Sequence, residues 1–193
     1  MFVSLVAFMS ATGAILLALS PQPLSPDLPQ ALLAVDGPIG ADPLDAVFDA
    51  TGGNRLNAWR YIHIRHSKTP GGDTTSQMAA GQPVGDHFVI CNGTGGDDGE
   101  IQITPRWTSQ RAALPPTGAA AIDPHCISVC LVGDLDRNPP TEKQLKRLSR
   151  LVCALQARLN IPANSVVVQP RRGTPAAAGG LFPTAEFRSQ ILP

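Results

Sequence analysis

One long amphipathic helix is the feature that most constrains how this chain folds. Thr141 and Gln144 stand at the two positions of a capping box, in which each side chain bonds the backbone N–H of the other residue. Apolar residues then recur at helical spacing, at Leu145, Leu148, Val152, Leu155 and Leu159. We expect the helix to end before Pro162, because the residue ahead of a proline disfavours helical geometry. Such an apolar stripe has to be buried against a second layer of structure.

The remaining pattern predicts that this second layer is a β-sheet. Strands are predicted near residues 60–66, 87–92, 99–104, 125–133 and 165–169. The Asp97-Asp98-Gly99 turn favours a hairpin between the second and third of these strands. Further helices are predicted near residues 43–50, over a fragment from Thr74 to Ala80, and from Thr184 to Ile191. This alternation indicates an α/β fold with one central mixed β-sheet flanked by helices.

The first 43 residues differ in composition from the rest. Residues 1–20 are mostly apolar and carry no charge, and about 20 such residues can span a bilayer. We interpret them as an export signal or a membrane anchor, while a buried soluble helix stays open because no Lys or Arg precedes Arg55. Residues 21–43 are rich in proline and predict an extended linker, so the folded domain is expected over 44–193. The protein is then exported, and is either membrane-anchored or periplasmic in the cell envelope.

Charge and cysteine content exclude several classes of partner. The chain has 15 basic and 15 acidic residues, so no bulk field attracts nucleic acid, and we expect no nucleic-acid partner and a monomer. The four cysteines lack the Cys-x-x-Cys spacing of a structural zinc site. They are interpreted as small buried hydrophobic residues: Cys91, Cys126, Cys130 and Cys153.

Five short motifs follow one another along the chain in a distinctive order. They are Ile62 to Thr69 (IHIRHSKT), Gly85 to Ile90 (GDHFVI), Ile127 to Leu135 (ISVCLVGDL), Pro140 to Leu145 (PTEKQL) and Gly179 to Pro183 (GGLFP). From about Trp59 to the C-terminus, the sequence resembles the zinc-dependent N-acetylmuramoyl-L-alanine amidases and the related peptidoglycan-recognition proteins. The resemblance implies a central sheet with a cleft across one face, and peptidoglycan as the ligand.

The same resemblance implies three zinc ligands and a catalytic tyrosine, and this chain departs from all four. The zinc positions correspond to Arg65, Gln169 and Ala178, and the tyrosine position to Asp86. An arginine stays protonated and cannot bind a cation, a glutamine amide is a poor zinc ligand, and alanine offers no donor atom. We therefore expect no catalytic residue, no metal site and no bound zinc.

The histidines do not replace the missing ligands in this interpretation. Period-two alternation along the first strand places His63 beside Arg65 and turns His66 to the other face. No triad is assembled from the four histidines, and each is interpreted as structural: His63, His66, His87 and His125.

The residues expected to line the cleft are His63, Arg65, Asp86, Arg106 and Gln169. Three interpretations of Arg65 stay open. It pairs with Asp86, or it binds the carboxylate of a peptide stem together with His63 and Arg106, or it faces solvent at a decayed site. For the whole protein we expect an exported amidase-like domain that binds peptidoglycan, a muropeptide or a cell-wall partner without cutting it. The alternatives are an active zinc-dependent amidase with displaced ligands, and a structural scaffold without a ligand.

Overall fold

The structure is a computed structural model that describes residues 32–33, 44–79, 84–115, 121–168 and 178–191. Chain contacts divide the protein into two units, Met1–Gln30 and Ala31–Pro193, and every described residue belongs to the second. The apolar segment 1–20 and most of the segment 21–43 lie outside the described residues. Within the described ranges, no helix has the length and apolarity needed to cross a membrane.

A six-stranded mixed sheet forms the centre of the second unit, in the order β1-β4-β3-β5-β2-β6. The strands are β1 (Leu32–Leu33), β2 (Tyr61–His66), β3 (Phe88–Ile90), β4 (Ile101–Ile103), β5 (Cys126–Leu131) and β6 (Val166–Val167). β2 is parallel to both β5 and β6, and β3 is parallel to β5. β3 and β4 form the predicted antiparallel hairpin, and β1 pairs antiparallel to β4. The predicted central mixed sheet flanked by helices is confirmed, with β1 as an addition inside the segment predicted as linker.

The long helix is α5 (Glu142–Leu159), and it begins as predicted. Thr141 accepts from the backbone N–H of Gln144, and the Gln144 side chain accepts from that of Thr141. The helix ends at Asn160, which has φ of 56° and a left-handed conformation. The other helices are α2 (Asp45–Asp49), α3 (Thr74–Ala79), α4 (Pro105–Thr108) and α6 (Thr184–Ile191), with a short 3-10 turn over Ala163–Ser165.

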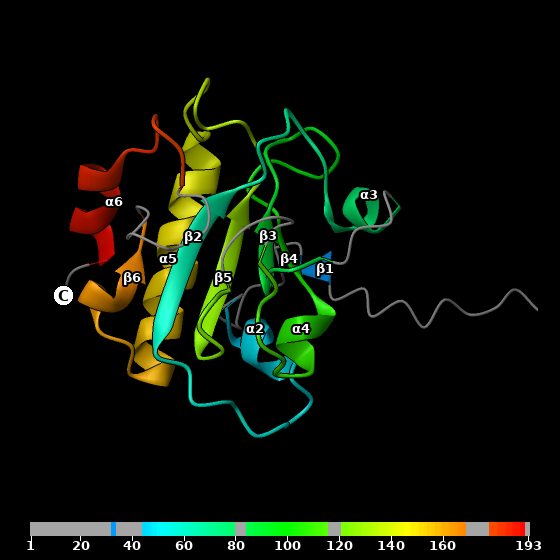
Figure 1. Cartoon of the computed structure of the whole chain (residues 1–193), viewed down its shortest axis with the longest axis vertical. Coiled ribbons are helices and arrows are strands. Elements are labelled where there is room, and N and C mark those ends of the chain that lie inside the picture. The colour runs from blue at the N-terminus through cyan, green and yellow to red at the C-terminus, as the bar shows by residue number, and fades with distance from the viewer. Residues whose placement is uncertain (1–31, 34–43, 80–83, 116–120, 169–177, 192–193) are drawn as a thin grey trace, which may run out of the picture. The chain divides into compact units, whose positions relative to one another are not determined.

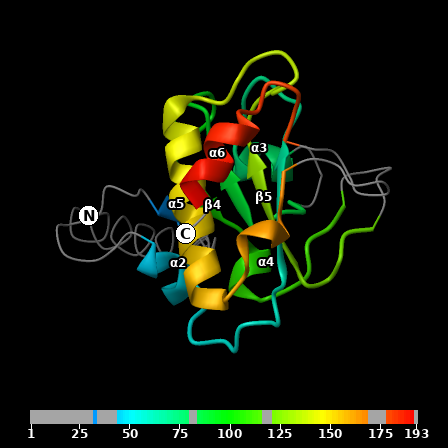
Figure 2. The same ribbon diagram turned by 90° about the vertical axis from the view of Figure 1, so that its left-hand side faces the viewer.

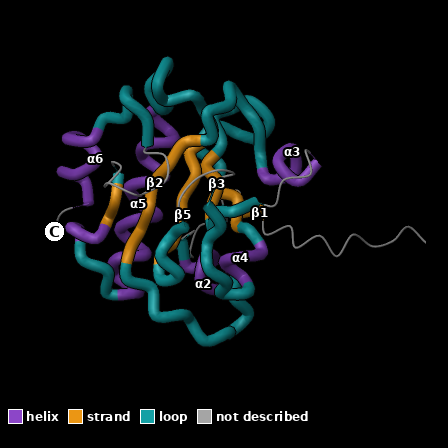
Figure 3. The backbone as a smooth tube through the Cα atoms, in the orientation of Figure 1, coloured by secondary structure: helices purple, strands orange, loops and turns teal. Residues whose placement is uncertain are grey.

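Helix α5 covers one face of the sheet (Figures 1 and 2). Its leucines share one apolar core with the inward residues of the strands, among them Ile62, Ile64 and Val129. Gln144 ties the start of α5 to the sheet, because its side-chain amide donates to the backbone carbonyls of Ile90 and Val132. In Figure 3, α5 lies behind β2 and β5, and the opposite face of these strands is turned toward the viewer.

The cysteines are all free thiols, three of them buried as predicted: Cys91, Cys126 and Cys130. Cys153 is exposed, so its assignment as a buried residue is wrong. It lies on α5 opposite the end of α6, with its sulfur 3.6 Å from the Gln190 carbonyl oxygen. The short helix α6 leaves this position open to solvent on one side.

Candidate functional site

Arg65 points away from α5 and meets Asp86 across the sheet. Its Nε donates to Asp86 Oδ1 at 2.8 Å, and its Nη2 donates to Asp86 Oδ2. The Arg65 side chain is 14% exposed and the Asp86 side chain 1% exposed. The ion-pair interpretation is therefore confirmed, and the interpretation of Arg65 as a solvent-facing residue is wrong.

Asp86 is fixed from two further directions. The Ser128 hydroxyl on β5 donates to Asp86 Oδ1 at 2.5 Å. The Thr104 hydroxyl, just after β4, donates to the backbone carbonyl of Asp86 at 2.6 Å. Asp86 thus bonds three other segments of the sheet through its carboxylate and its backbone carbonyl, and each carboxylate oxygen has a charged or hydroxyl donor. A buried ion pair keeps its charge only when its remaining lone pairs are satisfied in this way.

His63 lies two residues before Arg65 on the same face of β2. It is 4% exposed, and neither ring nitrogen has a hydrogen-bond partner among the described residues. Burial lowers the pKa of His63, with the charges of Asp86 and Arg65 acting on it in opposite directions. The ring is therefore neutral at physiological pH and offers one donor and one acceptor.

Arg106 is committed to the backbone. Its Nε donates to the Val84 carbonyl at 3.0 Å and its Nη1 to the Ala112 carbonyl at 2.7 Å. These bonds hold the segments before β3 and after α4 together. Arg106 is thus bonded to backbone carbonyls, while Arg65 is bonded to Asp86, so the two arginines have separate protein partners. The fifth predicted cleft residue, Gln169, lies outside the described residues.

His87 is a structural histidine, as predicted. Its Nδ1 accepts the backbone N–H of Ser128 at 3.0 Å, so the proton of the neutral ring is on Nε2, 2.8 Å from the Arg111 carbonyl. The ring lies edge-on to Trp59, with centroids 4.8 Å apart. Burial lowers the pKa of His87 to about 4. Both ring nitrogens of this histidine are hydrogen-bonded within the fold, so the ring is not available for proton transfer.

The buried thiols are equally unsuited to act as nucleophiles or as metal ligands. Burial raises the pKa of Cys91, of Cys126 and of Cys130 to about 12 each. The thiolate is the nucleophile and the metal ligand, so these cysteines are inert near neutral pH.

Two of the residues that the sequence resemblance places at zinc positions are described, and neither side chain offers a donor to a metal ion. Arg65 is a cation bonded to Asp86, and the buried Ala178 carries only a methyl group. The backbone N–H of Ala178 bonds the Val168 carbonyl at 3.0 Å, which holds this segment against the end of β6. A divalent ion has no donor at either position.

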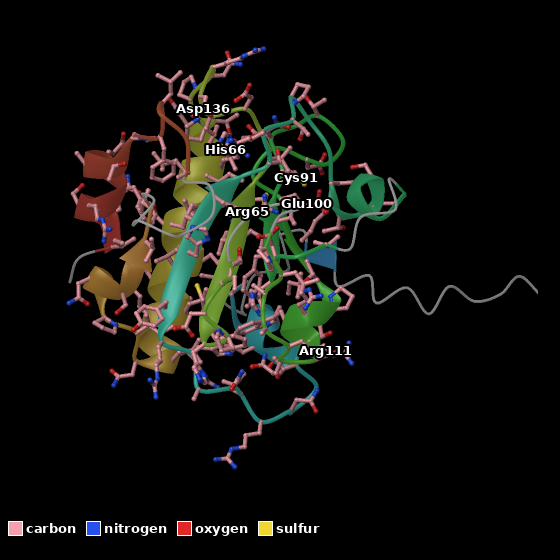
Figure 4. The ribbon with its side chains drawn as sticks, viewed as in Figure 1. Arg65, His66, Cys91, Glu100, Arg111 and Asp136 are labelled. Carbon is pink, nitrogen blue, oxygen red and sulfur yellow. The ribbon has the colours of Figure 1, made fainter. Side chains whose placement is uncertain are left out.

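A second group of possible metal ligands lies on the other face of the sheet, at the end of β2. The ligand atoms of His66, Asp134 and Asp136 all lie within 4.8 Å of one another. Figure 4 shows His66 and Asp136 near each other at this end of the strand. The sequence interpretation missed this group because it considered histidines alone. The available signal was Gly133-Asp134-Leu135-Asp136, a pair of acidic residues directly after a buried strand.

The protonation of His66 decides how well this group suits a metal. Its Nδ1 accepts the backbone N–H of Leu135 at 3.0 Å, so the proton of the neutral ring is on Nε2, which lies 3.7 Å from Asp136 Oδ2. A metal-binding histidine normally has the reverse arrangement, with its second nitrogen donating to a carbonyl or carboxylate. Asp136 also accepts from the Gly180 N–H at 2.9 Å. The contacts therefore favour an Nε2–H facing Asp136 over a metal-ligand bond.

Comparison with known proteins places this fold in a family. A family model of N-acetylmuramoyl-L-alanine amidases matches residues 55–178. The amidase AmiD from E. coli, solved with anhydro-N-acetylmuramic acid-L-Ala-D-gamma-Glu-L-Lys, is 18% identical with a TM-score of 0.50, over 72% of this chain and 60% of AmiD. The amidase LysC from Clostridium intestinale URNW is 17% identical with a TM-score of 0.47, over 72% of this chain and 90% of LysC.

A recognition protein is among the similar structures as well. PGRP-Hd from Alvinella pompejana is 15% identical with a TM-score of 0.42, over 72% of this chain and 87% of PGRP-Hd. No curated protein matches the sequence. The family match extends over more than half of the chain and includes β2, β3 and β5, which carry the Arg65 network. The chain belongs to the N-acetylmuramoyl-L-alanine amidase family.

Proposed function

We propose that this domain binds peptidoglycan, or a muropeptide derived from it, and does not hydrolyse it. The observation that carries the proposal is the Arg65–Asp86 ion pair. By the sequence resemblance, these two residues stand where the family has its first zinc ligand and its catalytic tyrosine. A fixed cation at this point repels a divalent ion, and no water can be activated there. The sheet, the capped helix and the strand ends that build the family's cleft are nevertheless retained.

Family membership supports the choice of ligand. The similar AmiD of E. coli was solved with a muropeptide bound, and we extend a ligand of that class to this chain. Binding without cleavage needs a formed cleft and polar groups, but no activated water. Arg65 and His63 supply polar groups on the face of the sheet away from α5.

The test incubates the full chain, purified in mild detergent, with isolated peptidoglycan in added zinc and in a chelator. Released stem peptides are sought by mass spectrometry, and the sedimented peptidoglycan is assayed for bound protein. We expect co-sedimentation without release in both conditions. Release that the chelator abolishes would overturn the proposal, whereas folded protein that neither binds nor cuts would support the alternative of a scaffold.

An active zinc amidase with displaced ligands is the second candidate, and the cluster of His66, Asp134 and Asp136 is the observation in its favour. In that case, replacing His66 by Gln abolishes chelator-sensitive release, and replacing Arg65 by Lys leaves it largely intact. His66 Nδ1 accepts the backbone N–H of Leu135, which places the ring proton on Nε2 and argues against this candidate.

We further propose that the domain is exported and held at the membrane by residues 1–20, and that it is monomeric. The support is the uncharged apolar run and the proline-rich segment after it. Cell fractionation of the full chain beside a variant that begins at residue 21 tests the anchor, and light scattering on the purified protein tests the monomer. Recovery of both forms in the same soluble fraction would contradict the anchor.

A further inference from the structure

We infer that Arg65 binds a carboxylate of an anionic peptide through the guanidinium N–H groups that Asp86 leaves unused. The inference rests on the proposed function and names the chemical group by which the ligand is held. It assigns a binding role to the residue that replaces a zinc ligand in the family pattern.

The donors of Arg65 can be accounted for one by one. A guanidinium carries five N–H groups. Nε and one N–H of Nη2 bind the two oxygens of Asp86, and one N–H of Nη1 bonds the His66 carbonyl at 3.3 Å. One N–H on Nη1 and one on Nη2 remain without a partner among the described residues. The two terminal nitrogens together form the second fork of the guanidinium, which matches the two oxygens of a carboxylate.

The fork is held in place before any ligand arrives. Asp86 fixes the guanidinium from one side, and the Ser128 and Thr104 hydroxyls fix Asp86 in turn. The side chain is 14% exposed, so it is largely packed and keeps a small surface in contact with solvent. Little rotamer entropy is then lost on binding, which favours affinity. In Figure 4, Arg65 lies over the middle of the sheet, on a face that carries no described helix in front of β2 and β5.

The charges around the fork select an anion over a neutral group. Asp86 is bonded to Arg65 and also acts electrostatically on Arg106, on which a further arginine, Arg111, acts as well. His63 is neutral, because burial lowers its pKa. Three arginines against one aspartate make these surroundings positive, and a planar guanidinium recognises a carboxylate better than an ammonium does.

His63 is an independent sign that a polar partner is missing on this face. Buried polar atoms nearly always have a hydrogen-bond partner, and each exception calls for an explanation. Both ring nitrogens of His63 lack a partner among the described residues, two positions from Arg65 on the same strand face. A ligand held at Arg65 brings further polar atoms to the part of the sheet where His63 lies.

Calorimetric titration of the full chain tests the inference with two probes. One is N-acetylmuramoyl-L-Ala-D-γ-Glu-L-Lys with free carboxylates, and the other is the same compound with its carboxylates converted to carboxamides. Hydrogen bonds from a guanidinium to a carboxylate are stronger than those to a neutral carboxamide, so we expect the acid form to bind about tenfold more tightly or better. Arg65→Lys keeps the charge without the fork and should bring the ratio close to one. Arg60→Lys, an exposed arginine just before the same strand, is the matched control and should keep the wild-type ratio.

The outcomes separate this inference from the proposed function. Equal affinity of the wild-type protein for both probes overturns the inference and leaves peptidoglycan binding intact. Binding of neither probe, with no co-sedimentation with peptidoglycan, overturns both. If Arg65→Lys fails to fold, equal affinity of the wild-type protein for the two probes still overturns the inference.

Discussion

Arg65 and Asp86 carry opposite charges in a place where little water reaches either side chain. Removing the cation leaves the Asp86 carboxylate buried and, among the described residues, with the Ser128 hydroxyl as its one remaining side-chain donor. Breaking a buried pair from one side typically costs about 3–5 kcal/mol. We therefore expect Arg65→Met to lower the free energy of unfolding by about this amount, measured by urea denaturation at neutral pH.

The double variant Arg65→Met with Asp86→Leu is the control for this prediction. It removes both charges, and replacing both members of a buried pair by apolar groups costs far less than removing one. We expect the double variant to be more stable than Arg65→Met alone. A single variant with the wild-type urea midpoint would show that the pair contributes little to folding.

His87 makes the stability of the domain depend on pH. Its pKa is lowered by burial to about 4 in the folded protein, against about 6.5 when unfolded. Between these values the unfolded chain binds a proton that the folded chain does not, so the stability falls as the pH falls. The slope from this one group approaches about 1.4 kcal/mol per pH unit between roughly pH 6 and 4.5. Above pH 7 the contribution of His87 no longer changes with pH.

Urea midpoints of the wild-type protein and of His87→Gln, taken at several pH values from 7.5 to 4.5, check this prediction. The glutamine amide does not titrate, so the variant should lose less stability between pH 7.5 and 4.5 than the wild type. His63 adds to the slope in both proteins in the same direction, because its pKa is lowered too. Parallel curves for the two proteins would assign the pH dependence to other groups.

At the scale of single elements, α5 depends on its capping box. Thr141 accepts the N–H of Gln144 at 3.0 Å and donates its hydroxyl proton to Asp98 at 2.5 Å. Loss of an N-cap side chain typically costs about 1 kcal/mol, and the lost bond to Asp98 adds to it. We expect Thr141→Ala to lower the free energy of unfolding by about 1–2 kcal/mol in urea denaturation. Thr141→Ser keeps the hydroxyl and should stay near wild type, and equal loss in both variants would point to the methyl group instead.

Elements whose signals all lie within one short segment of the sequence were predictable. The helix α5 has its cap and its apolar stripe within one segment, and the β3–β4 hairpin has its turn between the strands. Strand β1 was not predicted, because Leu32–Leu33 lie in a proline-rich stretch and pair with the distant β4. Helix α4 was missed because it has four residues, although Thr104 as its cap and Pro105 at its first position are recognisable start signals.

The candidate site was likewise predictable from the sequence only in part. The Arg65–Asp86 pair could be predicted, since strand alternation and the family pattern place both residues at one point. The role of Arg106 could not, because its acceptors are backbone carbonyls, which leave no trace in the sequence. Proximity of His66 to Asp136 depends on how the loop after β5 folds back over the end of β2.

At the scale of the whole molecule, the question is whether folding and metal binding are linked. A metal that binds only the folded protein raises its stability according to the ratio of metal concentration to dissociation constant, by about 2.7 kcal/mol at a hundredfold excess over that constant. The sequence resemblance places a zinc ligand at Arg65, where the structure has the ion pair with Asp86, and we propose that no zinc binds there. We therefore expect the Tm of the full chain to be the same in zinc and in a chelator.

Thermal unfolding followed by circular dichroism measures this, with zinc content determined by elemental analysis after dialysis. His66→Gln and Asp136→Asn serve as comparison variants, because they remove the other possible ligand group. A zinc-dependent rise in Tm that either variant abolishes would mean that the cluster at the end of β2 binds the metal, with the His66 proton displaced from Nε2. A rise that both variants retain would place zinc elsewhere. An unchanged Tm with less than one zinc ion per ten chains would support the proposal that this domain binds no zinc.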